Sequence, residues 1–132
     1  MLSILSLILI LIENSVSSNG VILLTTLPFI SYVVRKGGNI FYLILTYILV
    51  SLQTDSYLYI FLVILVYILL NEVLLSYIEY NKKTVFYILG VQIIFYNILS
   101  YKYFDVSYLI LNICGFIFWN YIYTKNVEIK GK

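Results

Sequence analysis

The sequence contains no histidine and a single cysteine, Cys114, which lies inside an apolar run. One cysteine cannot form an intrachain disulfide or supply a cysteine-rich metal cluster. Without histidine, the usual ligands of a zinc or haem site are missing as well. We therefore expect no metal site and no cofactor.

Charge is also scarce, since 11% of the 132 residues are Asp, Glu, Lys or Arg while 63% are hydrophobic. A typical soluble domain has about 25% charged and about 45–50% apolar residues. A chain this small cannot hide such an apolar excess in its core, because much of the surface of a small globule stays wet. The composition predicts an integral membrane protein with the lipid bilayer as its surroundings and no nucleic acid as a partner.

No linker, repeat or low-complexity segment divides the chain, so residues 1–132 are expected to form a single transmembrane helical domain. Its fourth apolar run has 22 residues, or roughly 33 Å of helix, which is enough to cross a hydrocarbon core of about 30 Å. The first three runs are shorter and need flanking polar residues to complete a span. The predicted fold is all-α, a compact bundle of about six transmembrane helices. The six runs are Leu2–Ile12, Val21–Val34, Ile40–Leu52, Tyr57–Ile78, Thr84–Tyr101 and Val106–Tyr123.

Basic residues gather at alternate breaks between these runs. Seven of the eight follow the second, fourth and sixth runs, and the remaining one, Lys102, follows the fifth. The positive-inside rule then predicts that both termini are cytoplasmic, an N-in/C-in topology. The first run has no basic region before it and no small-residue cleavage site after it, so we expect a membrane span rather than a removable signal peptide.

Asp55 stands between the third and fourth runs, within the polar stretch QTDS. If the chain did not reverse direction there, Lys82 and Lys83 would lie on the outer side of the membrane, against the positive-inside rule. We therefore expect Asp55 in a short outward-facing turn. Its carboxylate can cap the next helix by accepting from backbone N–H groups near Tyr57 and Leu58. The same turn can contact a periplasmic partner, and both roles remain open. Glu13, at the end of the first run, is expected in a turn at the same outer interface.

Glu72 lies inside the fourth run, roughly 10 Å from its cytoplasmic end. A carboxylate at the centre of a membrane helix costs about 2.5–3.5 kcal/mol, and less toward the interface. Three roles are open: a contact with Lys82 or Lys83 at the interface, a hydrogen bond to another span, or a proton or substrate site. Its neighbour Asn71 can donate a hydrogen bond to another helix.

The last two runs contain four further amides that can bond across helices, typically for about 0.6 kcal/mol each. In the last run Asn112 shares one helix face with Gly115 and Trp119, at positions i, i+3 and i+7. We expect Asn112 to serve helix packing rather than ligand contact, and we expect a neighbouring backbone to approach closely at Gly115. The four amides are Gln92, Asn97, Asn112 and Asn120.

The sequence contains no recognisable catalytic set. It has no nucleophile paired with a base, no phosphate-cradling glycine loop and no pair of carboxylates within one helical turn. The sequence therefore predicts a protein that is not an enzyme.

Three stretches occur in an order typical of one family of membrane proteins. VVRKGG (33–38) ends the second run, SLQTDSYLY (51–59) carries Asp55, and LILNICGFIFW (109–119) has an asparagine near its start and an aromatic residue at its end. Together with the six short runs, they resemble the family of the bacterial rod shape-determining membrane protein MreD. The chain differs from that family at Tyr47 and Ser51, where members usually have glycine.

The resemblance implies a multi-pass protein of the bacterial cytoplasmic (inner) membrane and a non-enzymatic component of the cell-shape (rod) complex. MreC-like and other elongation-complex membrane proteins would be its partners, and it would help couple peptidoglycan synthesis to the shape-determining machinery. No small-molecule ligand is expected in this interpretation. The alternative is the substrate-binding subunit of an energy-coupling-factor vitamin transporter, also a compact six-helix protein, although outer loops as short as these scarcely provide a lid.

Overall fold

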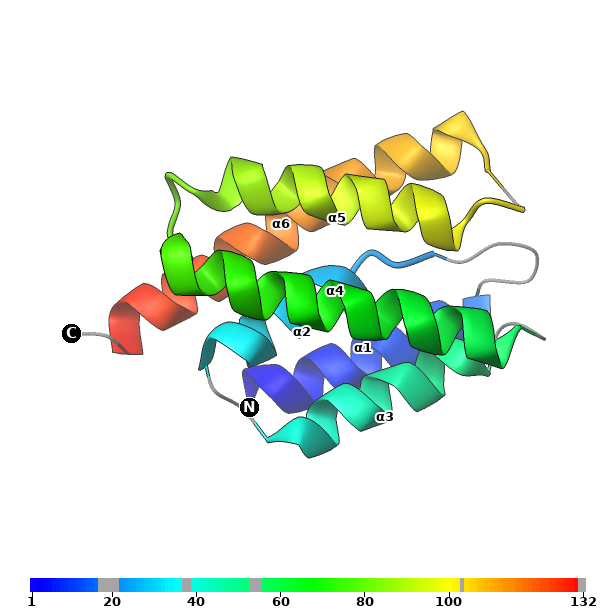
Figure 1. Ribbon diagram of the computed structural model, residues 1–132, viewed down its shortest axis with the longest axis horizontal. Helices are drawn as coiled ribbons and strands as arrows, with labels where there is room; N and C mark the ends of the chain where they lie inside the picture. The colour runs from blue at the N-terminus through cyan, green and yellow to red at the C-terminus, as the bar shows by residue number, and fades with distance from the viewer. Residues whose placement is uncertain (17–21, 37–38, 53–55, 103, 131–132) are drawn as a thin grey trace.

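The computed structural model describes residues 1–16, 22–36, 39–52, 56–102 and 104–130, with no side chains described beyond residue 127. The described residues form six α-helices and no strand, so the all-α prediction is confirmed (Figure 1). Each helix corresponds to one of the six apolar runs. The helices are α1 (Leu2–Val16), α2 (Thr26–Lys36), α3 (Ile40–Ser51), α4 (Tyr57–Tyr77), α5 (Val85–Leu99) and α6 (Val106–Lys130).

Successive helices run back and forth between two ends of the molecule. Figure 1 shows both termini at one end, together with the C-terminal ends of α2 and α4. The C-terminal ends of α1, α3 and α5 lie at the opposite end. Basic side chains at the first end are exposed: Arg35, Lys36, Lys82, Lys83 and Lys125. Lys102 follows α5 and therefore belongs to the opposite end.

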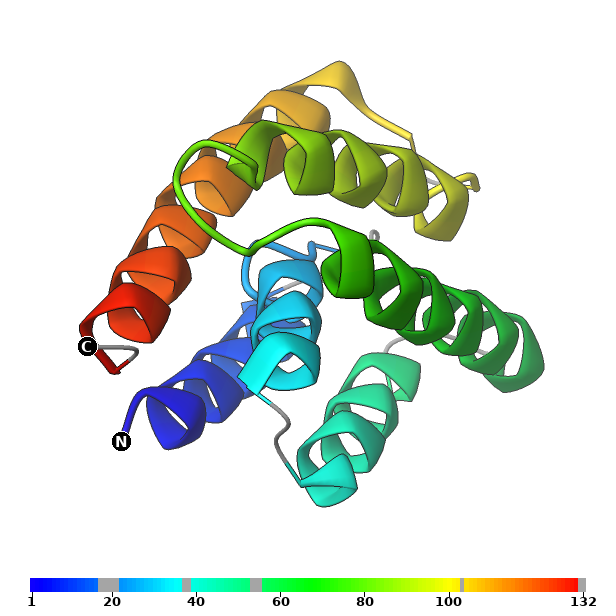
Figure 2. The ribbon, with the colours of Figure 1, turned by 60° about the vertical axis from the view of Figure 1, so that its left-hand side comes forward.

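α2 is the central element of the bundle, and it contacts all five other helices (Figure 2). Every residue from Thr26 to Val33 is buried. Leu27 and Ile30 pack in a cluster with apolar side chains of α4, α5 and α6. Phe29 and Tyr32 belong to a second cluster with side chains of α1, α5 and α6. Because both faces of α2 are covered, this short helix holds the two halves of the core together.

α2 begins later than the sequence predicts. The second run is apolar from Val21, but described residues 22–25 are not helical and the helix starts at Thr26. The prediction of a helix throughout that run is therefore wrong for these residues. With this start, Pro28 falls in the first helical turn, where an N–H group has no intrahelical partner and its absence costs little.

Polar side chains define the starts of three other helices. Asn39 accepts a hydrogen bond from a backbone N–H in the first turn of α3, Asp105 does so before α6, and Asn81 accepts from two N–H groups just before α5. Such caps satisfy donors that the helix itself leaves unpaired. For α4, the predicted capping residue Asp55 lies outside the described residues. The neighbouring Ser56 makes no side-chain cap bond.

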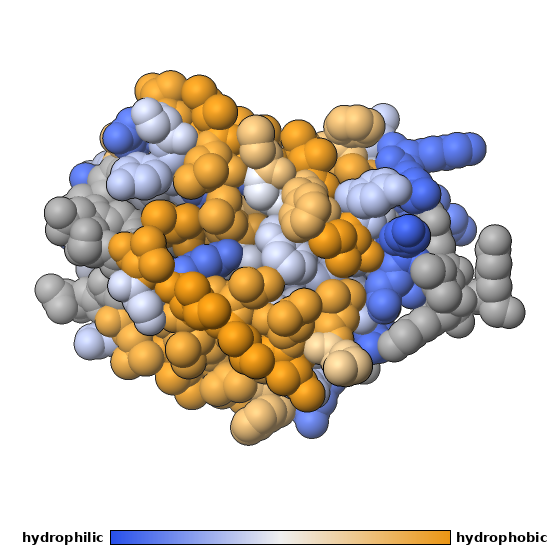
Figure 3. Space-filling view, turned by 180° about the vertical axis from the view of Figure 1, so that it is seen from behind, coloured by the Kyte–Doolittle hydropathy of each residue, from blue (hydrophilic) through white to orange (hydrophobic). Residues whose placement is uncertain are grey.

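The outer surface is strongly apolar. Large hydrophobic side chains are exposed on every helix except α2. Figure 3 shows a broad apolar face, with hydrophilic residues gathered mainly at one end. Two segments, α4 and residues Val106–Val127 of α6, are long and apolar enough to cross a membrane; α1, α3 and α5 are apolar but shorter.

Candidate functional site

Hydroxyl and amide side chains from several helices meet in the interior of the bundle. Buried polar groups require hydrogen-bond partners, because burial removes them from water. These groups find their partners in one another, and we call the set the interior polar network. Its members, all buried, are Ser31, Tyr67, Asn71, Tyr80, Gln92 and Asn120.

Ser31 joins α2 to α4 and α5. Its Oγ lies 2.7 Å from Tyr67 Oη, 2.8 Å from Asn71 Oδ1 and 3.3 Å from Gln92 Nε2. Each hydroxyl has one proton to donate. Ser31 donates to Asn71, and Tyr67 shares its one proton between the Ser31 hydroxyl and the backbone oxygen of Leu27, which lies 3.1 Å from Tyr67 Oη. Ser31 then also accepts from the Gln92 amide, so its oxygen is fully engaged.

Gln92 and Asn120 join α5 to α6. Asn120 Nδ2 donates to Gln92 Oε1 at 2.6 Å, and Gln92 Nε2 donates back to Asn120 Oδ1 at 3.2 Å. Tyr80, which lies in the segment between α4 and α5, also donates from its Oη to Asn120 Oδ1 at 2.7 Å. This bond connects that segment to the Gln92–Asn120 pair. The network therefore binds α2, α4, α5 and α6 together, and its groups are occupied by one another.

The amides predicted from the sequence are partly responsible for this network. Gln92 and Asn120 do bond across helices, whereas the buried Oδ1 of Asn97 has no partner among the described residues. Asn71 also bonds to another helix, but as an acceptor from Ser31; its own amide N–H donates within α4. Sequence reasoning missed Ser31 because a lone serine in an apolar run carries no periodic signal.

Asn112 holds the non-helical segment that precedes α2. It is buried, and its Oδ1 accepts from the backbone N–H of Leu23 at 3.0 Å. One turn along α6, Gly115 lies against Leu24: a Cβ added at this glycine would meet Leu24 Cδ2 at 2.6 Å. The close neighbour predicted at Gly115 is therefore a side chain, not a backbone.

Glu13 holds the same segment from the side of α1. Its Oε1 accepts from Thr25 Oγ1 at 2.6 Å, and its Oε2 lies 3.4 Å from the Thr25 backbone N. Glu13 is thus in the last turn of α1 and half-buried, not in a solvated turn as the sequence suggested. An acceptor at this place satisfies donors at the start of α2.

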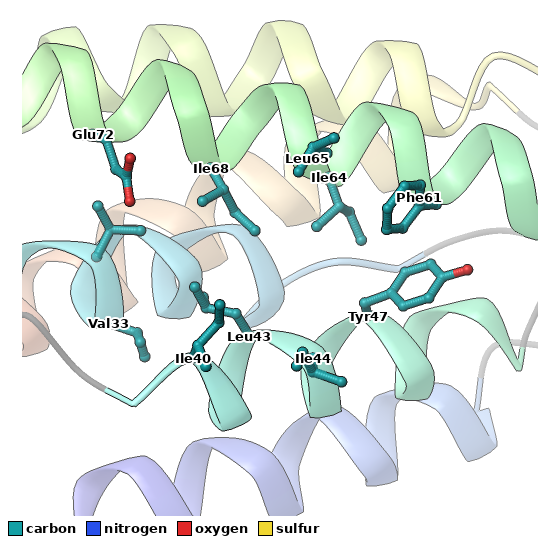
Figure 4. A pocket seen from close by; sticks show the side chains of 11 residues that line it. Val33, Ile40, Leu43, Ile44, Tyr47, Phe61, Ile64, Leu65, Ile68 and Glu72 are labelled. Carbon is teal, nitrogen blue, oxygen red and sulfur yellow. The ribbon is translucent and has the colours of Figure 1, made fainter.

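The outer side of the bundle has a groove of about 450 Å³ between α3 and α4, with α2 at one end of its floor. Figure 4 shows Tyr47 and Phe61 facing each other at one end and Glu72 at the other. The lining positions repeat at helical spacing on both walls, so each wall is one face of a helix. We call this feature the α3–α4 groove. Its lining residues are Val33, Val34, Ile40, Leu43, Ile44, Tyr47, Phe61, Ile64, Leu65, Ile68 and Glu72.

Glu72 is exposed, and its carboxylate extends toward the α3–α4 groove (Figure 4). Among the described residues Glu72 has no hydrogen bond or ion pair, either with another span or with Lys82 or Lys83, the first two of the roles left open by the sequence. Lys82 instead lies over the ring of Tyr121, 5.3 Å from its centroid. Of the four residues singled out from the sequence, Asn71 and Asn112 are structural, Glu72 lines the groove, and Asp55 lies outside the described residues.

The described part of the chain has no group of three or more Asp, Glu, Cys or His side chains that could hold a metal ion. Comparison with protein-family models, with curated proteins and with solved structures found no match to this chain.

Proposed function

We propose that the protein is a multi-pass membrane protein with both termini in the cytoplasm. The exposed apolar surface on five helices and the membrane-crossing length of α4 and α6 support this proposal. The clustering of basic residues at the end that carries both termini supports the orientation. The non-helical residues 22–25 fit a membrane protein as well, because irregular backbone is tolerated at membrane depth when protein covers it. Here Asn112 and Glu13 supply its hydrogen bonds.

α1, α3 and α5 contain 12 to 15 residues and are therefore about 18–22 Å long. Helices shorter than the hydrocarbon core are accommodated by local thinning of the bilayer or by flanking residues that reach the interface. α3 ends in Ser51 and is preceded by Asn39, and α5 is preceded by Thr84. Such polar flanks suit helices that end inside a thinned bilayer.

We further propose that the protein acts, like MreD, as a non-enzymatic component of the bacterial cell-shape complex, binding MreC-like membrane proteins. The observation that carries this proposal is the α3–α4 groove, which is apolar apart from Tyr47 and Glu72 and opens on the outside of the bundle. A vitamin-binding subunit would instead hold its ligand in a cavity near the outer face of the membrane, partly under loops between helices. The interior between α2, α4, α5 and α6 is occupied by the interior polar network, and this favours a protein that works through its outer surface.

Deletion of the gene and affinity purification of the full chain from native membranes test this function. We expect rod-shaped cells to become rounded after deletion, and we expect an MreC-like protein to co-purify with the wild-type chain. Cells that keep their shape but lose uptake of a vitamin would contradict the proposal and support the transporter subunit.

A further inference from the structure

The α3–α4 groove has the dimensions of a helix-binding surface. Its wall on α4 extends from Phe61 to Glu72, twelve residues that span about 16 Å, or three helical turns. The facing wall on α3 runs from Ile40 to Tyr47, about two turns. A helix that lies in such a groove inserts side chains at i, i+3, i+4 and i+7 spacing, and a volume of about 450 Å³ suits a few large apolar side chains.

Glu72 is the one charged residue among those that line this groove. Ten other residues line the groove and none of them is charged. A carboxylate in apolar surroundings needs a cationic or hydrogen-bonding partner, or it takes up a proton. No described residue supplies that partner, whereas the other polar side chain of the groove, Tyr47, donates to the backbone oxygen of Tyr57 at 3.3 Å.

We propose that the α3–α4 groove binds a membrane-spanning helix of another protein that carries a lysine or arginine at the level of Glu72. Apolar side chains of that helix fill the groove between Ile44 and Leu65. Its basic side chain pairs with the Glu72 carboxylate near the cytoplasmic end. This inference rests on the proposed function, since it names the chemistry of the partner that a cell-shape component would recognise.

Charge complementarity distinguishes this occupant from a second copy of the same chain. None of the six apolar runs of the sequence contains a lysine or arginine. In a second copy the basic residues lie in the last two turns of the helices or beyond them, as Lys125 does in α6, so a different protein with a cation inside its apolar run is the better complement to Glu72.

Synthetic transmembrane peptides test the proposal directly. The full chain is reconstituted in lipid vesicles with a fluorescent donor on Cys114, which is exposed and is the single cysteine of the sequence. Association with an acceptor-labelled polyleucine helix is then measured by energy transfer. One peptide carries a lysine about 10 Å from its cytoplasmic end, and the matched peptide carries leucine there. We expect the wild type to bind the lysine peptide about tenfold more tightly.

Two variants and two controls locate the binding. Glu72→Gln should reduce the preference for the lysine peptide to less than about twofold, and Leu65→Trp should weaken the binding of both peptides by filling the groove. Glu79→Gln changes an exposed carboxylate outside the groove, and Leu69→Trp enlarges an exposed α4 side chain that does not line it. Both controls should behave as the wild type does. Thermal unfolding of each variant checks that it remains folded.

Equal binding of the two peptides by the wild type, or an unchanged preference in Glu72→Gln, would overturn the proposal. Binding of dodecylammonium without binding of the lysine peptide would also overturn it and make the groove a site for small cationic amphiphiles. Co-purification separates the two proposals. A wild-type chain that retains an MreC-like partner but shows no peptide preference leaves the proposed function in place and removes the groove proposal. A wild-type chain that prefers the lysine peptide but retains no MreC-like partner leaves the groove proposal in place and removes the proposed function.

Discussion

Gln92 and Asn120 face each other across α5 and α6 and exchange two amide hydrogen bonds, of 2.6 and 3.2 Å. Both side chains are fully buried, so neither can exchange its partner for water. A pair of this kind fixes the register of the two helices, because a shift along either axis would leave a donor and an acceptor unpaired.

Replacement of Gln92 by leucine should lower the free energy of unfolding by about 1–3 kcal/mol, because it leaves Asn120 Nδ2 buried without an acceptor. Asn97→Leu is the matched control on the same helix, since the Oδ1 of Asn97 has no partner in the part of the chain that the structure describes. That variant should be as stable as the wild type or more stable. Denaturant titration in detergent micelles measures both. Equal losses in the two variants would show that the amide pair contributes no more than an ordinary α5 side chain.

Gly115→Ala should destabilise the protein by about 1–3 kcal/mol, because the added methyl group meets the Leu24 side chain. Gly90 provides the control, since a Cβ there meets nothing within 4 Å. Gly90→Ala should gain up to about 1 kcal/mol through helix propensity. Leu24→Ala, combined with Gly115→Ala, should recover much of the loss in thermal stability. If Gly115→Ala is as stable as Gly90→Ala, the contact with Leu24 has no energetic role.

The number and type of the helices could be predicted from the sequence, because apolar runs separated by polar breaks leave few other folds for such a chain. The starts of α1, α3, α4 and α6 coincide with the starts of their runs. The start of α2 could not be predicted from apolar character alone, because side chains distant in the sequence hold residues 22–25. Pro28 was the local signal, since proline is favoured in the first turn of a helix.

The interior polar network was predictable only in part. Amides inside apolar runs are expensive to bury, so Gln92 and Asn120 could be expected to bond across helices. The hydrogen bonds of Ser31 and Tyr67 could not be predicted in this way, since serine and tyrosine occur throughout this sequence. The α3–α4 groove was also missed, because the apolar side chains that line it are the same in type as those that face outward on the same helices.

Glu13→Ala should reduce the free energy of unfolding by about 1–2 kcal/mol, because Glu13 accepts from the hydroxyl of Thr25 at the start of α2. Thr25→Val removes the same hydroxyl, so the two losses should overlap, with a coupling of about 0.5–3 kcal/mol in a double-mutant cycle. Glu72→Ala removes a carboxylate that has no partner among the described residues and should change stability by less than about 0.5 kcal/mol. Strictly additive losses at Glu13 and Thr25 would mean that the two side chains do not stabilise each other.

The proposed orientation of the chain rests on the distribution of basic residues over the two ends of the bundle. Lys83 precedes α5 at the end that carries both termini, and Lys102 follows α5 at the opposite end. Both side chains are exposed, so a cysteine at either position should be reachable from the aqueous side that it faces. The Cys114→Ser substitution removes the natural thiol. In that background, labelling of a cysteine at position 83 or at position 102 from outside the cell distinguishes the two possible orientations.

Lys102→Cys should be labelled in intact cells by a membrane-impermeant maleimide, because the positive-inside rule places the sparsely charged end outside. Lys83→Cys should be protected in intact cells and labelled after permeabilisation with detergent, and this second step checks that its thiol is accessible. Each variant keeps most of the basic bias, since six of the seven basic residues at the cytoplasmic breaks remain in Lys83→Cys and all seven remain in Lys102→Cys. Labelling of Lys83→Cys from outside, with protection of Lys102→Cys, would reverse the topology and place Glu72 near the external surface. Labelling of both from outside would mean that α5 does not cross the membrane.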